Sequence, residues 1–253
     1  MRHDRCHLRL FLLLIPLLFS GLLSAQETAP LITYGPGSKT GEGDDDFKQA
    51  FFFKIPASNR DSLYIRLFDP DVGGTFDAVY GTGWNSTTRF RLYGGAGAYS
   101  TEGTKSAILN QKAFTCGTIL GEIETGSNPF YDNLWVNFWT VLPEKGEVID
   151  GWSYFKLTVE GLTGDDGNIY EVRVSDKPDY NSYPKDLTLY TFTPTLRVPR
   201  LGTFAELRFD ANFITNNNTE GRTISIHNFD LAEAPLSVET YYRSGLSVVS
   251  SKN

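Results

Sequence analysis

Short segments in which apolar and polar residues alternate recur along most of this 253-residue chain. Over residues 62–68, for example, Leu63, Ile65 and Leu67 fall on one face of an extended strand. A period of two is typical of half-buried β-strands, and turn-forming clusters separate these segments at short spacing. The sequence therefore predicts an all-β fold, an antiparallel β-sandwich of jelly-roll-like type with little helix. Strands are expected at 49–55, 62–68, 88–93, 114–123, 134–141, 154–160, 169–174, 187–192, 205–209, 223–226 and 236–242, and a short helix at 104–112.

The same pattern predicts one large domain. Residues 26–43 are rich in Gly, Pro, Ser and Thr and are expected to form a flexible leader, residues 44–245 the β-sandwich, and residues 246–253 a tail. A Gly-Asp-Asp cluster precedes a strand both after Glu42 and after Thr163. Two related halves, near 44–125 and 145–245, are one interpretation. Chance in a chain rich in Gly and Asp is the other.

The first 25 residues are typical of a secretory signal peptide. A basic start with Arg2, Arg5 and Arg9 precedes the apolar run 10–19, and small residues lead to Ala25. The run is shorter than the roughly 18 residues that would span a bilayer. We therefore expect cleavage after Ala25 and an exported protein, in the periplasm or at the cell surface or exterior, without a membrane span. A retained anchor is the alternative.

Composition narrows what the exported chain can bind. Without residues 1–25, the 23 basic and 30 acidic residues become 20 and 29, a net charge of about −9. A nucleic-acid surface is not expected without a basic excess. One cysteine, Cys116, and one histidine, His227, remain, which excludes an internal disulfide and a zinc site built from Cys and His. Cys116 is expected to be a buried, inert thiol, because no residue near it in the sequence supplies a base.

Aspartates in a tight, glycine-rich loop are the strongest local signal. Asp69 and Asp71 alternate ahead of two glycines, and Asp77 follows. Hard oxygen ligands of this kind suit calcium, and Asp44 and Asp46, which precede another strand, could join them. The sequence thus predicts a structural calcium site at Asp69, Asp71, Asp77, Asp44 and Asp46. The alternative is a polar hairpin turn, in which Asp, Gly and Pro are favoured for backbone reasons.

Aromatic residues are the second signal, because exposed rings on a β-sandwich can stack on sugars. Trp84 stands in the loop-like segment 80–85, and we predict Trp84 and Tyr99 as ligand-binding residues. Trp135 and Trp139 lie four apart on one strand and are expected in the core.

No catalytic motif is recognisable, so the chain is predicted not to be an enzyme. There is no Gly-x-Ser-x-Gly elbow, no His-Glu-x-x-His and no phosphate-binding loop. The less favoured alternative, a polysaccharide-active enzyme, needs two carboxylates about 5 to 9 Å apart in a cleft.

Four segments, at 53–56, 63–74, 88–100 and 161–170, together resemble exported β-sandwich modules of Gram-negative bacterial envelope proteins. More distantly, they are similar to the pre-peptidase C-terminal type of β-sandwich. The resemblance extends over about residues 41–240 and implies a non-catalytic accessory role, with no known catalytic residues. We therefore expect a binding or structural module, for adhesion to an envelope protein or glycan, with a carbohydrate-binding module as the alternative.

Overall fold

The computed structural model describes residues 31–38, 47–79, 83–105, 111–127 and 130–192, together with the backbone of residues 236–240 and 243–248. The expected signal peptide, Asp44, Asp46, His227 and the strands expected at 205–209 and 223–226 lie outside these residues. Within the part described, no helix is long and apolar enough to cross a bilayer.

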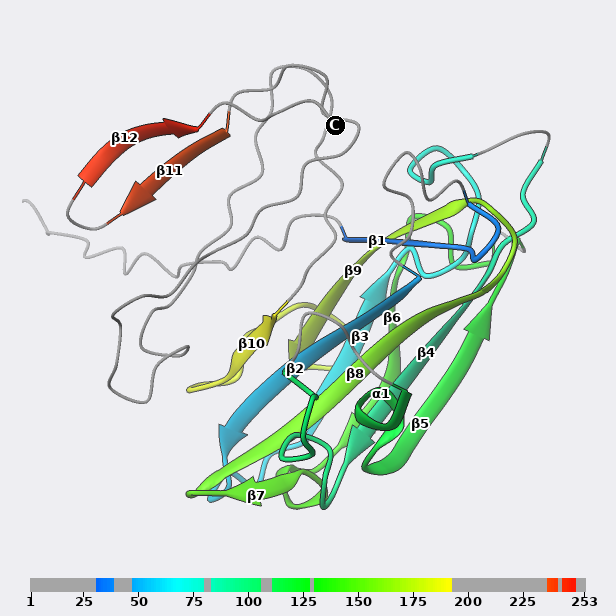
Figure 1. The fold of residues 1–253 in the computed structure, drawn as a ribbon. Coiled ribbons are helices and arrows are strands. Elements are labelled where there is room, and N and C mark those ends of the chain that lie inside the picture. The colour runs from blue at the N-terminus through cyan, green and yellow to red at the C-terminus, as the bar shows by residue number, and fades with distance from the viewer. Residues whose placement is uncertain are drawn as a thin grey trace, which may run out of the picture.

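The protein is an all-β sandwich, as the period-two pattern predicts (Figure 1). Its strands are β1 (Leu31–Tyr34), β2 (Lys48–Pro56), β3 (Leu63–Phe68), β4 (Thr87–Gly94), β5 (Thr118–Thr125), β6 (Trp135–Val141), β7 (Glu147–Ile149), β8 (Trp152–Thr163), β9 (Gly167–Ser175), β10 (Thr188–Thr191), β11 (Leu236–Thr240) and β12 (Arg243–Val248). A helix α1 (Gln111–Thr115) and a 3-10 turn η2 (Pro143–Lys145) complete the described elements.

The strand order is that of a jelly roll. One sheet has the order β1-β9-β3-β6, and the facing sheet has the order β10-β2-β8-β4-β5, with β7 pairing to β8. The chain passes from one sheet to the other at most connections, and the pairings between these strands are antiparallel. Strands from 44–125 and from 145–245 are interleaved in both sheets, so neither range forms a layer by itself. The strands β11 and β12 pair with each other.

The core lies between the two sheets. Phe90 and Leu157 of one sheet pack with Leu67 and Val172 of the other, and all four side chains are buried. A second cluster continues this core along the strands, from Leu67 at the end of β3 to Leu63 at its start. In it, Phe53 stacks on Phe155 with 4.7 Å between ring centroids. Burial of such alternate positions is the main stabilising contribution of a sandwich of this kind.

The structure differs from the sequence prediction in three places. Residues 31–34, expected in the flexible leader, form the buried strand β1 against β9. The described helix covers Gln111–Thr115, whereas Thr104 and Lys105 lie in a turn, and residues 106–110 of the expected helix lie outside the described residues. Phe114, expected at the start of a strand, is instead a buried residue of the helix. The strand that follows, β5, begins at Thr118.

Candidate functional site

Three loops meet at one end of the sandwich, because β3, β5 and β8 end there and β4, β6 and β9 begin there (Figure 1). Backbone hydrogen bonds join them: Val72 N–H donates to the Gly126 carbonyl at 3.0 Å, and Ala78 and Gly167 bond to each other in both directions. We call this region the acidic loop end. Its described carboxylates are Asp69, Asp71, Asp77, Asp132, Asp165 and Asp166.

Asp69 and Asp71 bind the loop before β6 through their carboxylates. Asp69 Oδ1 accepts a hydrogen bond from the Asn133 amide at 2.8 Å, and Asp71 Oδ2 accepts one from the Tyr131 amide at 2.6 Å. Both aspartates are buried, at 1% and 3% exposure. Asp69 and Asp71, whose spacing suggested ion ligands, therefore connect the loop after β3 to the loop before β6.

Asp77 connects the first loop to β9. Its Oδ2 accepts from the Gly73 amide at 2.6 Å, and its Oδ1 accepts from the Ile169 amide at 2.5 Å. Burial raises the pKa of Asp77 to about 8, although these two amides act to lower it, and the charges of Asp69 and Asp132 raise it further.

Asp132, which the sequence analysis did not single out, completes the group. Its carboxylate lies within hydrogen-bonding range of Asp69, and it packs so closely on Gly74 that a Cβ there would lie 2.4 Å from Asp132 Oδ2. Asp69 Oδ2 and Asp132 Oδ1 are both buried and have no hydrogen-bond partner among the residues that the structure describes. The result is two neighbouring carboxylates, each with one oxygen that nothing in the described part of the chain satisfies.

This arrangement disfavours full ionisation. Burial raises the pKa of Asp69 to about 6; the Asn133 amide acts in the opposite direction, and Asp132 raises the pKa further through its charge and hydrogen bond. Burial likewise raises the pKa of Asp71, against the hydrogen bond from Tyr131 and together with the charge of Asp132. Like charges held together in a dry site have this effect.

No three His, Cys, Asp or Glu side chains converge as a ready metal site among the residues that the structure describes. Asp69, Asp71 and Asp77 are thus brought to one end but not onto one point. The two that lie within hydrogen-bonding range of each other are Asp69 and Asp132.

The second Gly-Asp-Asp cluster binds the loop before β4. Asp166 Oδ2 accepts from the Asn85 amide at 2.7 Å, and the Asn85 side chain donates to Asp165 Oδ1 at 2.7 Å. In return, the Asp166 amide donates to Ser86 Oγ at 2.8 Å. Polar residues of a turn thereby satisfy one another across two loops.

The two aromatic residues predicted to bind ligand lie in different settings. Trp84 belongs to the acidic loop end; its half-buried indole lies about 3.9 Å from where a Cβ on Gly73 would stand. Tyr99 instead stacks on Tyr154, with ring centroids 4.2 Å apart, and Lys105 Nζ lies 4.0 Å from its centroid. Its ring is therefore engaged within the protein.

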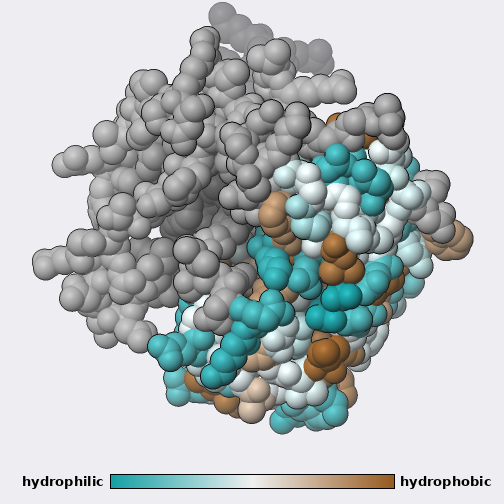
Figure 2. All heavy atoms as spheres, turned by 45° about the vertical axis from the view of Figure 1, so that its right-hand side comes forward, coloured by the Kyte–Doolittle hydropathy of each residue, from teal (hydrophilic) through white to brown (hydrophobic). Residues whose placement is uncertain are grey.

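Exposed apolar side chains border the acidic loop end. Phe76 is 50% exposed, Phe130 71% and Leu134 53%, and they come from the same two loops as Asp69 and Asp132. On the face drawn in Figure 2, apolar residues form separate brown areas among polar ones rather than one continuous patch. Such scattered exposure is common on proteins, and here it lies beside buried carboxylates.

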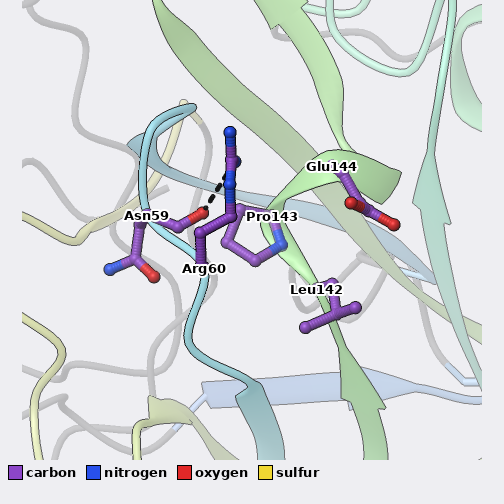
Figure 3. Close-up of a pocket in the computed structure, with 5 residues that line it drawn as sticks. All are labelled: Asn59, Arg60, Leu142, Pro143 and Glu144. Atoms are coloured by element: carbon purple, nitrogen blue, oxygen red, sulfur yellow. Dashed lines mark hydrogen bonds between the residues drawn. The ribbon is translucent and has the colours of Figure 1, made fainter.

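Figure 3 shows a pocket formed by the β2–β3 connection and η2. It is lined by Asn59, Arg60, Leu142, Pro143 and Glu144, and its volume is about 40 Å³. Pockets for small ligands usually measure roughly 300–1,000 Å³. This one has room for little more than solvent.

The chain was compared with protein-family models, with curated protein sequences and with solved structures, and no match was found in any of the three.

Proposed function

We propose that this protein is an exported, non-catalytic binding or structural module whose acidic loop end is organised by a calcium ion at Asp69 and Asp132. The observation that carries the proposal is the closeness of these two carboxylates, each with a buried oxygen that has no hydrogen-bond partner among the described residues. A buried acceptor left unsatisfied costs about 1–3 kcal/mol, and more when charged. A cation removes this cost and the repulsion together.

The surrounding charge favours a cation as well. Asp71 and Asp77 add negative potential, and none of the ion pairs among the described residues brings a Lys or Arg to any of these four aspartates. The negative charge of these aspartates can therefore be neutralised by a proton or by an external cation.

Calcium fits better than magnesium because it accepts irregular geometry and takes carbonyl and water oxygens beside carboxylates. Asp69 and Asp132 would supply only part of its coordination. The oxygens of Asp71 and Asp77 that bond backbone amides already have another role.

We propose that a partner binds at the acidic loop end as well. Phe76, Phe130 and Leu134 present apolar surface beside the proposed ion, and loops positioned by a rigid sandwich are usual places for recognition. An envelope protein is the partner class that we favour. A glycan is the second candidate, supported by the half-buried Trp84 at this end.

Thermal unfolding of the purified protein at pH 8, in excess calcium and in chelator, tests the ion. Calcium at a hundred times its dissociation constant should add about 2.7 kcal/mol, or roughly 5–10 °C for a domain of this size. Asp69→Asn and Asp132→Asn should abolish the shift, whereas Asp61→Asn, in the exposed loop after β2, should keep it. No shift in the unmodified protein would refute the proposal.

A further inference from the structure

A cysteine and a buried lysine meet on the outer face of the larger sheet. Cys116 follows α1, and its side chain is half-buried. Lys156 is in the middle of β8 and is 0% exposed. The Lys156 Nζ lies 3.3 Å from the Cys116 Sγ and also donates to the carbonyls of Ala113, at 2.7 Å, and Cys116, at 2.8 Å. The helix therefore places a thiol directly over the end of the lysine.

Lys156 has no carboxylate in an ion pair among the described residues. Burial lowers the pKa of Lys156, and the charges of Cys116 and Glu147 act to raise it. A buried ammonium without a counterion is costly. The group nearest to its nitrogen that can become an anion is the Cys116 thiol.

The protonated Cys116 thiol lies near two backbone carbonyls that can accept its hydrogen bond. Its S–H can donate to Gly97 O at 2.9 Å or to Ala113 O at 3.2 Å. Transfer of this proton to a neutral Lys156 amine gives a thiolate and an ammonium in contact. Each charge then has its counterion within the site, and the sulfur becomes nucleophilic.

We propose that Cys116 and Lys156 form a thiol–amine pair that makes Cys116 a modification site for peroxides. The thiolate sulfur attacks one oxygen of hydrogen peroxide, an S–O bond forms and the O–O bond breaks. The departing hydroxide takes the proton from the Lys156 ammonium and leaves as water. The cysteine is oxidised to sulfenic acid and the peroxide is reduced to water. The pair does not depend on the calcium site.

The other cysteine of the chain, Cys6, lies in the expected signal peptide. Once that segment is removed, the sulfenic acid has no cysteine in its own chain with which to form a disulfide. It would persist long enough to be trapped by dimedone, a reagent specific for sulfenic acids.

Dimedone labelling during brief exposure to hydrogen peroxide at neutral pH, followed by mass spectrometry of the intact protein, tests the pair. Lys156→Met keeps an unbranched side chain, one atom shorter than that of lysine, and removes the amine. It should slow labelling at Cys116 about tenfold or more, the range over which such neighbours change thiol reactivity. Lys54→Met, on the adjacent strand β2, should label at the normal rate, and Cys116→Ser should not label at all.

Labelling in urea separates the effect of the pair from a change of fold. Unfolded Lys156→Met and unfolded unmodified protein should react alike. If Lys156→Met does not fold, the unmodified protein still decides: its folded form should be labelled faster than its urea-unfolded form. Equal rates for folded Lys156→Met and the unmodified protein, or a folded protein that labels more slowly than the unfolded chain, would overturn the assignment.

Discussion

The carboxyl groups of Asp69 and Asp132 lie within hydrogen-bonding range of each other, and each keeps one buried oxygen for which the described residues offer no partner. The backbone amide of Asn133 holds the other oxygen of Asp69, so the carboxylate cannot turn away without losing that bond. The loops thus hold negative charge that a proton or a cation can neutralise. The first two predictions follow from this relationship.

Asp69→Asn should stabilise the protein in chelator at pH 8. The amide keeps an oxygen to accept from Asn133, removes one charge and can donate to Asp132. We expect a gain of about 1–3 kcal/mol, in line with the raised pKa of Asp69. Chemical unfolding measures it. A variant less stable than the unmodified protein in chelator would show that the two carboxylates do not repel each other.

Stability in chelator should fall as the pH rises. Asp69, with a pKa of about 6, and Asp77, with a pKa of about 8, bind protons more tightly in the folded state than their usual value of 3.8 allows in the unfolded chain. The stability that they contribute is fully present below pH 3.8 and is lost as the pH rises through about 6 and about 8. Unfolding free energies from pH 4 to 9 test this. Asp69→Asn should flatten the dependence of the unfolding free energy on pH around pH 6. An unchanged dependence in that variant would contradict the raised pKa of Asp69.

Glu147→Gln should destabilise the protein by about 1.5–3 kcal/mol. The Glu147 carboxylate accepts from the amides of Gly97, Tyr99 and Ser100 at 2.6–2.9 Å. Burial acts to raise its pKa, but these bonds and the Ser100 hydroxyl outweigh it and hold the pKa below the usual 4.5. Its contribution is present above pH 4.5 and is lost as the pH falls through the lower folded value.

The exposed Glu144 of η2 gives the matched control for that substitution. Glu144→Gln should change the unfolding free energy by less than about 0.5 kcal/mol. Equal effects of the two substitutions would show that the loop containing Gly97, Tyr99 and Ser100 does not depend on Glu147.

Asn168→Asp should cost about 3–5 kcal/mol, since it buries a charge without a counterion. Asn168 is 0% exposed, and its Nδ2 donates to Pro70 O at 2.8 Å and to Thr88 Oγ1 at 3.0 Å. Asn59→Asp is the control, because the Asn59 side chain accepts a hydrogen bond from the Asp61 amide through its Oδ1, a role that a carboxylate oxygen can keep. Urea unfolding compares them, and a near-neutral Asn168→Asp would mean that this link between loop and strand is not needed.

Trp84→Ala should weaken glycan binding, if the protein binds a glycan, by about 1–3 kcal/mol, as loss of a stacking ring does. Tyr99→Ala should act on stability instead, because its ring packs on Tyr154 and Phe52. Glycan-array binding and thermal unfolding of both variants separate these roles. Glycan binding that survives Trp84→Ala unchanged would leave the apolar side chains Phe76 and Phe130 as the recognition surface.

The fold was predictable because alternation is a local signal. Leu63, Ile65 and Leu67 alternate within a single strand, and all three are buried as expected. By contrast, β1 is only four residues long and lies in a segment rich in turn-forming residues. It can be recognised as a strand only from its pairing with β9. The end of the helix was placed too early, because Phe114 looks like the first residue of a strand until the helix packs on the sheet.

The candidate site was predictable only in part. Asp69, Asp71 and Asp77 stood out because they lie close together in the sequence. Asp132 is a single acid with no motif around it, and only the meeting of the β3–β4 and β5–β6 loops brings it to Asp69. The available signal was its position just ahead of a predicted strand. The contact between Cys116 and Lys156, 40 residues apart, left no local trace at all.

Calorimetric titration of calcium into the purified, chelator-treated protein at pH 8 tests the central claim most directly. We predict one calcium ion per chain, weaker binding at pH 5, where protons compete for Asp69, and no binding by the Asp69→Asn, Asp132→Asn double variant. No heat of binding in the unmodified protein, or binding that the double variant retains, would contradict the account.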